Sequence, residues 1–494
     1  MEPVRPPRSL FAPTPSGAWG REAGQASVFV VATFGIVLLA AFLVYNTGRQ
    51  VITKMHMQNT ADSAAYSGSV MLARAYNFAA YSNRAMVANQ VAIAQLVGLT
   101  SWARYYCTIY NAECGDYPSP TGSYGAYEEI VAEFDAYFNG GGTSDVQTVM
   151  DSYGPASQTL FDAINTGAGP IITVLDGINK ALSDASLAYY DATLVDLGLA
   201  LANAGPLATI VQANDPNAQV SQFGLGVLTA DVAQIKSFVT RYTPLDNQND
   251  PNNRFHQVVV NSLDPFSSGR SSTETPPFPL FAAGSCLGDG DGFFTMGAIY
   301  NGSTTLSNDN AMWSAKDAAT FLGGGVCIIQ VPTPVGDIPV PIPLFGGAYD
   351  SNQAYAGSSA SANTLYQVPD STYSGLQPYY DVSNLKAKDW VSPTLTLFLS
   401  RAGNTIATTQ YAKSAIGAPQ GTPQNGNLPV LNMTDADKGS VMASSASSEA
   451  YFARPLTAWQ LGGQTVYGNL FNPYWEARLV PTSTALQAAA AAVQ

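Results

Sequence analysis

The side chains that most often carry chemistry are scarce in this chain. Only two histidines, His56 and His256, occur among 494 residues. General acid–base catalysis and transition-metal binding depend mainly on histidine, so there is little room for either. We interpret both as surface or packing residues, with His256 at the start of a strand. The G-x-S-x-G, H-E-x-x-H and G-x-x-x-x-G-K-[ST] signatures are also absent, so we expect neither enzymatic activity nor a cofactor or metal.

Two acidic patterns have the residue types of a cation site but lack the spacing. The run from Gly288 to Gly292, with Asp289 and Asp291, offers carboxylates to calcium without the downstream bidentate glutamate of an EF-hand loop. A plain turn is the favoured interpretation. Asp184-Ala185-Ser186 begins like the D-x-S-x-S site of von Willebrand A domains, but Leu187-Ala188 follows inside a predicted helix, and we reject that site.

The four cysteines indicate disulfides rather than chemistry. Cys107, Cys114, Cys286 and Cys327 are even in number, form no C-x-x-C pair, and all follow the apolar N-terminal segment. An oxidising compartment beyond a membrane would pair them. We expect Cys107 with Cys114 and Cys286 with Cys327, although four cysteines allow three connectivities. Four free, buried thiols are the alternative.

The overall charge excludes one class of partner. The net charge is −14 and the pI is near 4.4, so the phosphate backbone would be repelled and we expect no nucleic-acid binding. With 46% hydrophobic and only 11% charged residues, the chain is globular with uncharged polar surfaces suited to assembly. Its length favours two or three folded units. Anionic lipid also repels it, so attachment to the lipid bilayer requires insertion.

A segment that could insert lies near the N-terminus. The twenty residues from Ala26 to Tyr45 carry no charge and match a hydrocarbon core about 30 Å thick at roughly 1.5 Å per residue. We expect a transmembrane helix at 26–45 after a cytoplasmic tail at 1–25. A buried core helix and a cleaved signal peptide are the alternatives. The flanking basic residues favour a cytoplasmic N-terminus only weakly: Arg5, Arg8 and Arg21 before the segment, Arg49 and Lys54 after it.

The helix is predicted to continue as a stalk over 46–110. Residues 46–95 contain no proline and only two glycines. A narrow stripe of mostly small residues recurs at spacings of three and four and permits close helix packing. It consists of Ala61, Ala65, Gly68, Leu72, Tyr76, Ala79, Val87, Val91 and Ala94. This face packs either on later helices of the same chain or on a second copy.

Helical periodicity continues over 111–250, which we predict to be an antiparallel bundle. One helix carries Tyr127, Ile130, Val131, Phe134 and Phe138, with Glu128 and Glu129 in its first turn. A second is expected to open at Pro170 and stop at Gly205-Pro206. Its predicted buried side is Ile171, Val174, Leu175, Ile178, Ala181, Leu182 and Ala185. A third is expected from Ala218 to Arg241.

The remainder, 251–480, is predicted to be mainly β. Short β-prone runs at 255–260, Cys327 to Val331 and Thr394 to Leu399 are separated by Gly, Pro, Asn and Ser. The proline-rich stretch 331–345 is either an edge hairpin turning at Gly336-Asp337 or a polyproline-like arm. It serves either partner contact or protection of a sheet edge. Residues 481–494 are expected to be a flexible tail, and the fold class is α+β.

Several short motifs resemble one known family. They are Gly24-Gln25-Ala26, Asn46-Thr47-Gly48-Arg49, the run Gln58-Asn59-Thr60-Ala61-Asp62-Ser63-Ala64-Ala65-Tyr66, Arg74-Ala75-Tyr76-Asn77-Phe78, Asn83-Arg84-Ala85-Met86-Val87-Ala88-Asn89-Gln90, Ala450 to Pro455, and Leu470-Phe471-Asn472-Pro473-Tyr474-Trp475 continuing to Leu479. The N-terminal region resembles TadE/TadG-like Flp (Tad) pilus assembly proteins, and the later motifs resemble a longer Tad-like subgroup. The match touches both termini.

The resemblance implies a single-pass protein of the bacterial inner membrane, with a large body outside the cytoplasm and other Tad pilus assembly proteins as partners. Cleavage after Gly24 would place Phe29 where pilins carry glutamate, which argues against processing as a pilin. The von Willebrand domain of some TadG proteins is not evident. We therefore expect a structural or assembly component of a Tad pilus or related secretion apparatus; the alternative is a minor pilin or tip adhesin whose β-rich part binds a surface or partner cell.

Overall fold

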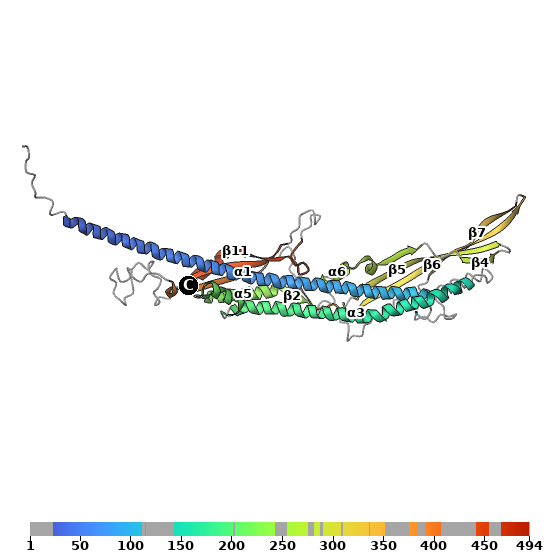
Figure 1. Cartoon of the computed structure of the whole chain (residues 1–494), viewed down its shortest axis with the longest axis horizontal. Helices are drawn as coiled ribbons and strands as arrows, with labels where there is room; N and C mark the ends of the chain where they lie inside the picture. Colours follow the sequence, from blue (N-terminus) through green and yellow to red (C-terminus); the bar gives the residue numbers. More distant parts are fainter. Residues whose placement is uncertain are drawn as a thin grey trace, which may run out of the picture.

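The protein is a long rod built on one helix (Figure 1). The computed structural model describes residues 23–110, 114, 143–200, 203–242, 254–274, 281–286, 290–307, 310–334, 336–350, 375–383, 391–406, 441–453 and 466–493. The predicted helix at 127–138 and most of the predicted cytoplasmic tail lie outside these residues. The α+β class predicted from the sequence is confirmed, since long helices come first and most strands follow.

Helix α1, Ala23–Tyr110, forms the axis of the rod with 88 residues. At about 1.5 Å per residue its length is roughly 130 Å. Its first turns project beyond the rest of the molecule and are exposed, and the predicted span and stalk are one continuous helix (Figure 1). The small-residue stripe from Ala61 to Ala94 is mostly buried within the chain, against α3 and the strands that pack on α1.

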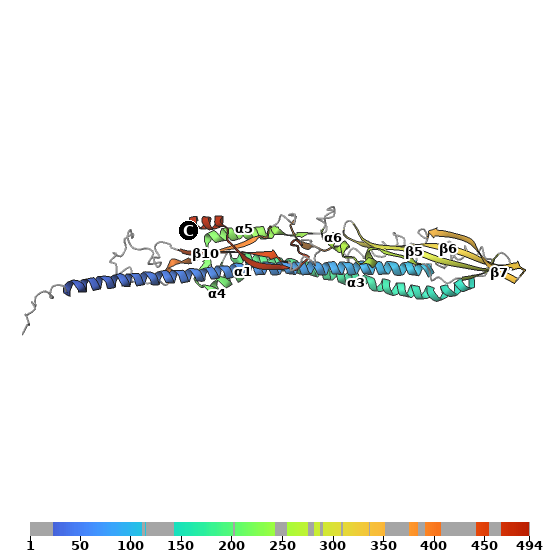
Figure 2. The same ribbon diagram turned by 90° about the horizontal axis from the view of Figure 1, so that it is seen from above.

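Helix α3, Thr143–Leu199, runs back along α1 (Figures 1 and 2). The predicted start at Pro170 is wrong, because the helix passes through both Pro155 and Pro170. An internal proline removes one hydrogen bond and costs roughly 3 kcal/mol, which the long contact with α1 offsets. The predicted buried side is also wrong: Ile171, Val174, Ile178, Ala181 and Ala185 are exposed, and Leu175 and Leu182 are half-buried.

Residues 200–242 contain shorter elements than predicted. Helix α3 ends before the expected stop, and Gly205 and Pro206 instead begin α4, Gly205–Asn214. Gly205 has a φ of +76°, which suits glycine at this reversal. The helix predicted from Ala218 to Arg241 is flanked by strands: β1 is Ala218–Val220, α5 is Gln222–Phe238, and β2 is Val239–Tyr242. The Ser221 side chain caps α5 by accepting a hydrogen bond from the Gly224 amide.

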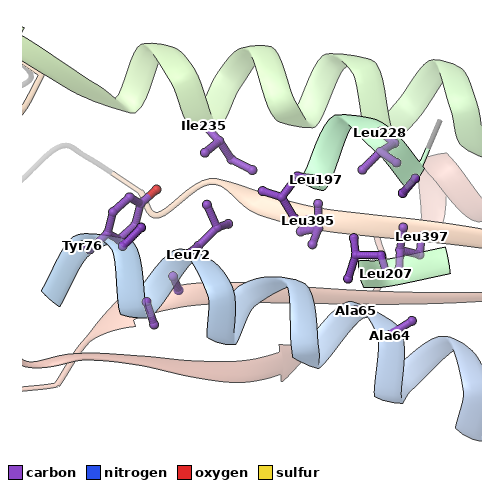
Figure 3. Close-up of a cluster of buried hydrophobic side chains, with 14 of the residues drawn as sticks. Ala64, Ala65, Leu72, Tyr76, Leu197, Leu207, Leu228, Ile235, Leu395 and Leu397 are labelled. Atoms are coloured by element: carbon purple, nitrogen blue, oxygen red, sulfur yellow. The ribbon is translucent and has the colours of Figure 1, made fainter. Parts of the chain in front are cut away.

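A four-stranded antiparallel sheet packs on the half of α1 nearest its N-terminal end. Its order is β1-β9-β10-β11, with β9 Thr394–Ala402, β10 Val441–Phe452 and β11 Trp475–Val480. Strand β9 lies between α1 and α5 and is buried on both faces (Figure 3). Leu72 and Tyr76 of α1, Leu395 of β9 and Ile235 of α5 meet in this core.

The middle of the rod carries a second core around the later turns of α1. Strand β8, Tyr379–Val382, pairs with β2, and helix α6, Arg254–Asn261, packs against α1. The strand predicted at 255–260 is therefore wrong. Phe255 and Val259 lie one helical turn apart, and both are buried, so packing overrides the strand preference of the valines. A short helix, α7, Pro265–Ser268, follows with Asp264 as its cap.

A second sheet occupies the end of the rod farthest from the N-terminus (Figure 1). It contains β3 Arg270–Glu274, β4 Phe281–Cys286, β5 Gly290–Leu306, β6 Trp313–Thr333 and β7 Gly336–Asp350. The predicted edge hairpin is present and β7 is an edge strand, but the predicted turn at Gly336-Asp337 is wrong: Thr333 pairs with Gly336 and Pro332 with Asp337, so the turn comes before Gly336. Prolines occur at every second position of β7, at 339, 341 and 343, which places their missing N–H groups on the unpaired side.

The alanine-rich C-terminus, for which we expected a flexible tail, forms a helix over most of its length. Helix α10, Thr484–Val493, follows β11 and lies beside the half of the rod nearest the N-terminal end of α1 (Figure 2). Alanine has the highest intrinsic helix propensity, which accounts for the helix.

Candidate functional site

The N-terminal part of α1 is apolar, yet it is exposed rather than packed in a core. In the described part of the chain, this is the one helix long and apolar enough to cross a membrane. An 18-residue window has a mean hydropathy of 2.7, and none of it is buried. Val30, Phe34 and Val37 are each more than 60% exposed within the predicted span from Ala26 to Tyr45. Such a surface requires a lipid or protein environment.

Beyond the span, a row of amide side chains on α1 holds the C-terminal part of the chain. We call Gln58, Asn77, Asn83 and Gln90 the amide row. Each bonds to groups far away in the sequence, and all four lie in the motifs that carry the resemblance. Because an amide offers both donors and an acceptor, it can replace a missing strand partner for exposed backbone groups.

The first member of the amide row fastens strand β10. Gln58 Nε2 donates to the Ser445 carbonyl at 2.9 Å, and the Ser444 hydroxyl donates to Gln58 Oε1 at 2.7 Å. Gln58 Nε2 also donates to Asp62, another motif residue, at 2.9 Å. One side chain therefore satisfies two consecutive residues of β10.

The second member, Asn77, fixes the start of β11. Its Nδ2 donates to the Trp475 carbonyl at 2.9 Å, and the Trp475 amide donates to Asn77 Oδ1 at 3.0 Å. The Trp475 indole lies edge-on to Tyr76, with 4.9 Å between ring centroids, and donates to the Asn469 carbonyl at 3.0 Å. The motifs from both ends of the sequence thus meet at one point.

The two remaining members bind strands β8 and β6 and the segments that precede β8 and β11. Asn83 is fully buried, and its Nδ2 donates to the carbonyls of Tyr380, at 2.6 Å, and Leu470, at 2.8 Å. Gln90 accepts from the Trp313 indole at 2.9 Å and donates to the Gly375 carbonyl at 3.3 Å. The amide row therefore ties four separate segments to one helix.

The other motif residues have different surroundings. Asn59 and Arg84 are exposed, and Ala61 is fully buried. Asn89 Nδ2 donates to Asn179 Oδ1 of α3 at 2.9 Å. The turn before β11 supplies the rest: Phe471 is buried, and Asn472, Pro473 and Tyr474 are half-buried.

An open groove of about 660 Å³ lies beside these residues, between α1, α6 and the turn before β11. Arg84, Val87, Arg254, Val258 and Phe471 are among its lining residues. The Arg254 guanidinium lies 5.6 Å from the centre of the Phe471 ring and 3.0 Å from Asp381. The lining offers guanidinium and apolar surface but no nucleophile with a general base.

A buried ion pair within the far sheet, between β3 and β6, is tied to α1 through Ser101, and the sequence pattern did not predict it. Arg270 Nε and Nη2 donate to the two oxygens of Asp317 at 2.8 and 2.9 Å, and Ser101 and Tyr300 also hydrogen-bond to this carboxylate. Burial opposes the charge of Arg270, but Asp317 outweighs it and raises the pKa of Arg270. Burial, with the charge of Asp317, raises the pKa of Tyr300. The available signal was a pair of opposite charges in β-prone runs of a chain with few charges.

The predicted disulfide between Cys107 and Cys114 is confirmed. It lies at the far end of α1, with 5.8 Å between the Cα atoms. Arg104 Nε donates to the Cys114 carbonyl at 2.9 Å. Cys286 faces Gly290 and Cys327 faces Gly292, so the two lie on the strands either side of β5. Their side chains lie outside the described residues, and their pairing stays a prediction.

The residues first considered for chemistry lie apart from one another. His56 is exposed on α1, and His256 lies in α6, where its ring hydrogen-bonds to Asn310. Strand β4 ends at Cys286 and β5 begins at Gly290, so the glycine-aspartate run falls where two paired strands connect. Within the residues that the structure describes, no three His, Cys, Asp or Glu side chains gather as a metal site.

One known family matches this chain. Residues 24–80 match the family described as putative Flp pilus-assembly TadE/G-like. No curated protein and no solved structure matches. The resemblance expected from the sequence motifs is thereby confirmed for the N-terminal part, which contains the apolar segment and the first half of the stalk. This is a family of assembly proteins, not typically enzymes.

Asp231 gives the core a testable pH dependence. It is buried on α5, where its Oδ2 accepts from the Thr396 amide at 2.7 Å, and burial raises its pKa to about 6. A carboxyl with a raised pKa contributes stability below its unfolded value of about 3.9, which is lost as the pH rises through about 6. We expect Asp231→Asn to equal wild type near pH 4 and to be more stable near pH 7, by about 1–3 kcal/mol.

Urea unfolding of both proteins at the two pH values measures this difference. Asn retains an oxygen that accepts from Thr396, so the hydrogen bond itself is preserved. An advantage of the variant that is equal at both pH values, or absent near pH 7, would contradict the assignment.

Proposed function

We propose that this protein is a membrane-anchored structural or assembly component of a Tad (Flp) pilus or related secretion apparatus. The observation that carries the proposal is the coincidence of the family match at 24–80 with an exposed apolar helix that continues without a break into a rigid rod. The span would cross the bacterial inner membrane once. The Cys107–Cys114 disulfide supports an extracytoplasmic location for the body.

The geometry suits a spacer that holds a sheet away from the membrane. From Asn46 to Tyr110, α1 has a length of about 100 Å at roughly 1.5 Å per residue. Pairing with α3 stiffens it, and the amide row fastens the C-terminal strands along it. The proposed partners are lipid, through the span, and other Tad pilus proteins, through the rod. The net charge of −14 argues against nucleic acid.

One observation favours the second candidate, a minor pilin or tip adhesin. The β6–β7 hairpin at the far end of the rod exposes Val331, Ile338 and Val340, which are 38 to 50% accessible (Figure 1). An apolar tip is suited to contact with a surface or partner cell. Presence of this chain in purified filaments would support this candidate over a static anchor.

Deletion of the gene tests the main proposal. We expect the null strain to lose surface pili, and the full-length chain to restore them. A chain with Ile36→Arg and Leu39→Arg should fail, because each charge at the centre of a span costs about 2.5–3.5 kcal/mol on insertion scales. Electron microscopy of pili and membrane fractionation of the chain measure both effects.

The matched control is Tyr81→Arg, which adds a charge at an exposed stalk position outside the motifs and should restore pili. Unchanged pili in the null strain would refute the assembly role. Full activity of the doubly charged variant would refute anchoring.

A further inference from the structure

Helix α3 carries an uninterrupted apolar stripe on a face that none of the described residues covers. We call it the outer seam. Its members are Leu160, Ile164, Gly167, Ile171, Val174, Ile178, Ala181, Ala185, Ala188, Ala192, Val195 and Leu199. Ile164 and Gly167 are half-buried, and the other ten are exposed. Val174 is 61% and Val195 60% exposed, and α3 runs along one edge of the rod (Figure 1).

The opposite face of α3, which packs on α1, mixes polar side chains with apolar ones such as Ile172, Tyr190 and Leu197. The buried positions on it include Asp176, Asn179, Ser183, Ser186 and Thr193. An amphipathic helix in water normally buries its apolar stripe and exposes its polar one. Helix α3 instead buries a mixed face and leaves its continuous apolar stripe exposed, so this stripe is not adapted to water.

The spacing of the outer seam specifies the kind of partner. Consecutive members alternate between four and three residues apart without interruption from Leu160 to Leu199. Apolar positions with an average period of 3.5, sustained over more than three or four heptads, define a left-handed coiled coil. The partner is therefore another α-helix with a matching seam about 60 Å long, at roughly 1.5 Å per residue.

We propose that α3 of a second copy of this chain covers the outer seam, in a parallel and in-register coiled coil. This inference rests on the proposed membrane anchor, because copies inserted in one membrane have their α3 helices pointing in the same direction. In this register, each seam residue of one copy packs against the same residue of the other copy. The alanines from Ala181 to Ala192 then allow close approach, between larger side chains at both ends.

The size and charge of the seam are compatible with this pairing. Its twelve positions and their flanks give about 24 residues a side, within the roughly 20–30 that a stable interface takes from each partner. Asp184, on one flank, is already paired with Lys180 at 2.8 Å within the same copy. Asp191 and Asp196 would face their counterparts and oppose association, so added salt should strengthen the pair by screening them.

Cysteine crosslinking in membranes tests the proposal on the full-length chain. Val174→Cys places thiols at the same level of the seam, and Lys180→Cys is the control on the same helix but outside the seam. Disulfides need Cα atoms within roughly 4.4–6.8 Å, so under mild oxidation we expect at least about tenfold more dimer from Val174→Cys. The dimer should have twice the mass of the 51.9 kDa chain.

A second variant separates association from folding. Ile171→Glu with Ile178→Glu alters two exposed side chains, so it should reduce the crosslinking of Val195→Cys to the level of Lys180→Cys without changing the melting temperature. Equal crosslinking from Val174→Cys and Lys180→Cys in the membrane fraction would overturn the proposal. So would a crosslinked product whose mass requires a different protein. Recovery of the chain outside the membrane fraction would instead refute the anchor.

Discussion

Replacing Asp317 with alanine is expected to lower the free energy of unfolding by about 3–5 kcal/mol, because it leaves the Arg270 guanidinium buried without its counter-charge. Arg270 is 3% and Asp317 0% exposed at the side chain. Water therefore cannot replace the lost partner. The same change removes an acceptor from Ser101 of α1 and Tyr300 of β5, so it loosens the attachment of the far sheet to the rod.

Urea unfolding of the full-length chain in detergent measures the loss. The matched control is Asp184→Ala, which breaks the exposed pair with Lys180 and should cost no more than about 1 kcal/mol. Replacing both buried partners, by Arg270→Met with Asp317→Leu, should recover most of the stability, since no charge is then left unpaired. If Asp317→Ala is no less stable than Asp184→Ala, the Arg270–Asp317 pair is not buried and hydrogen-bonded as described.

Truncating Trp475 to alanine is expected to destabilise the sheet nearest the N-terminal end of α1 by about 3–5 kcal/mol, which is typical of a buried tryptophan. The ring is 2% exposed and contacts Tyr76, Phe238 and Phe452 from three different elements. Removing the indole also takes away the N–H group that donates to the Asn469 carbonyl. The Asn77 side chain remains, but the start of β11 loses its packing.

Thermal unfolding monitored by circular dichroism checks this expectation. Tyr467→Ala is the control, because that ring is 47% exposed and its loss should change stability by no more than about 0.5 kcal/mol. Trp475→Phe retains most of the packing and should lie between the two. Equal melting temperatures for Trp475→Ala and Tyr467→Ala would show that the indole does not hold the motifs together.

The local sequence pattern was sufficient to predict helix α1 but not to predict where helix α3 begins. Twenty uncharged residues followed by a proline-free stretch allow few structures other than one long helix. Proline at 170 is a common first residue of a helix, and the prediction began α3 there. The contact with α1 that stabilises the preceding turns lies outside any local window. The same limitation explains the strand wrongly predicted at 255–260, where burial of Phe255 and Val259 decides for helix.

The sequence motifs identified the residues of the candidate site but not the groups to which they hydrogen-bond. Gln58, Asn83 and Gln90 were singled out from the family resemblance, whereas their polar side chains alone do not reveal what they bind. The Gly375 carbonyl lies in a segment of no recognisable pattern, and the Leu470 carbonyl belongs to a motif whose sequence does not reveal that it accepts from Asn83. The outer seam is a further case: the prediction identified an apolar face on α3 but expected it to be buried within the chain, whereas the structure leaves most of it exposed.

The separation in sequence between Asn77 and Trp475, 398 residues, also determines when the protein can fold. Ribosomes add about 5–20 residues per second, so the N-terminal helix waits for roughly 20–80 seconds before its last strand exists. During that interval the row of amides and the alanine stripe beside it remain open. A chain that stops early can never close them, so such a fragment would keep that face exposed to proteolysis.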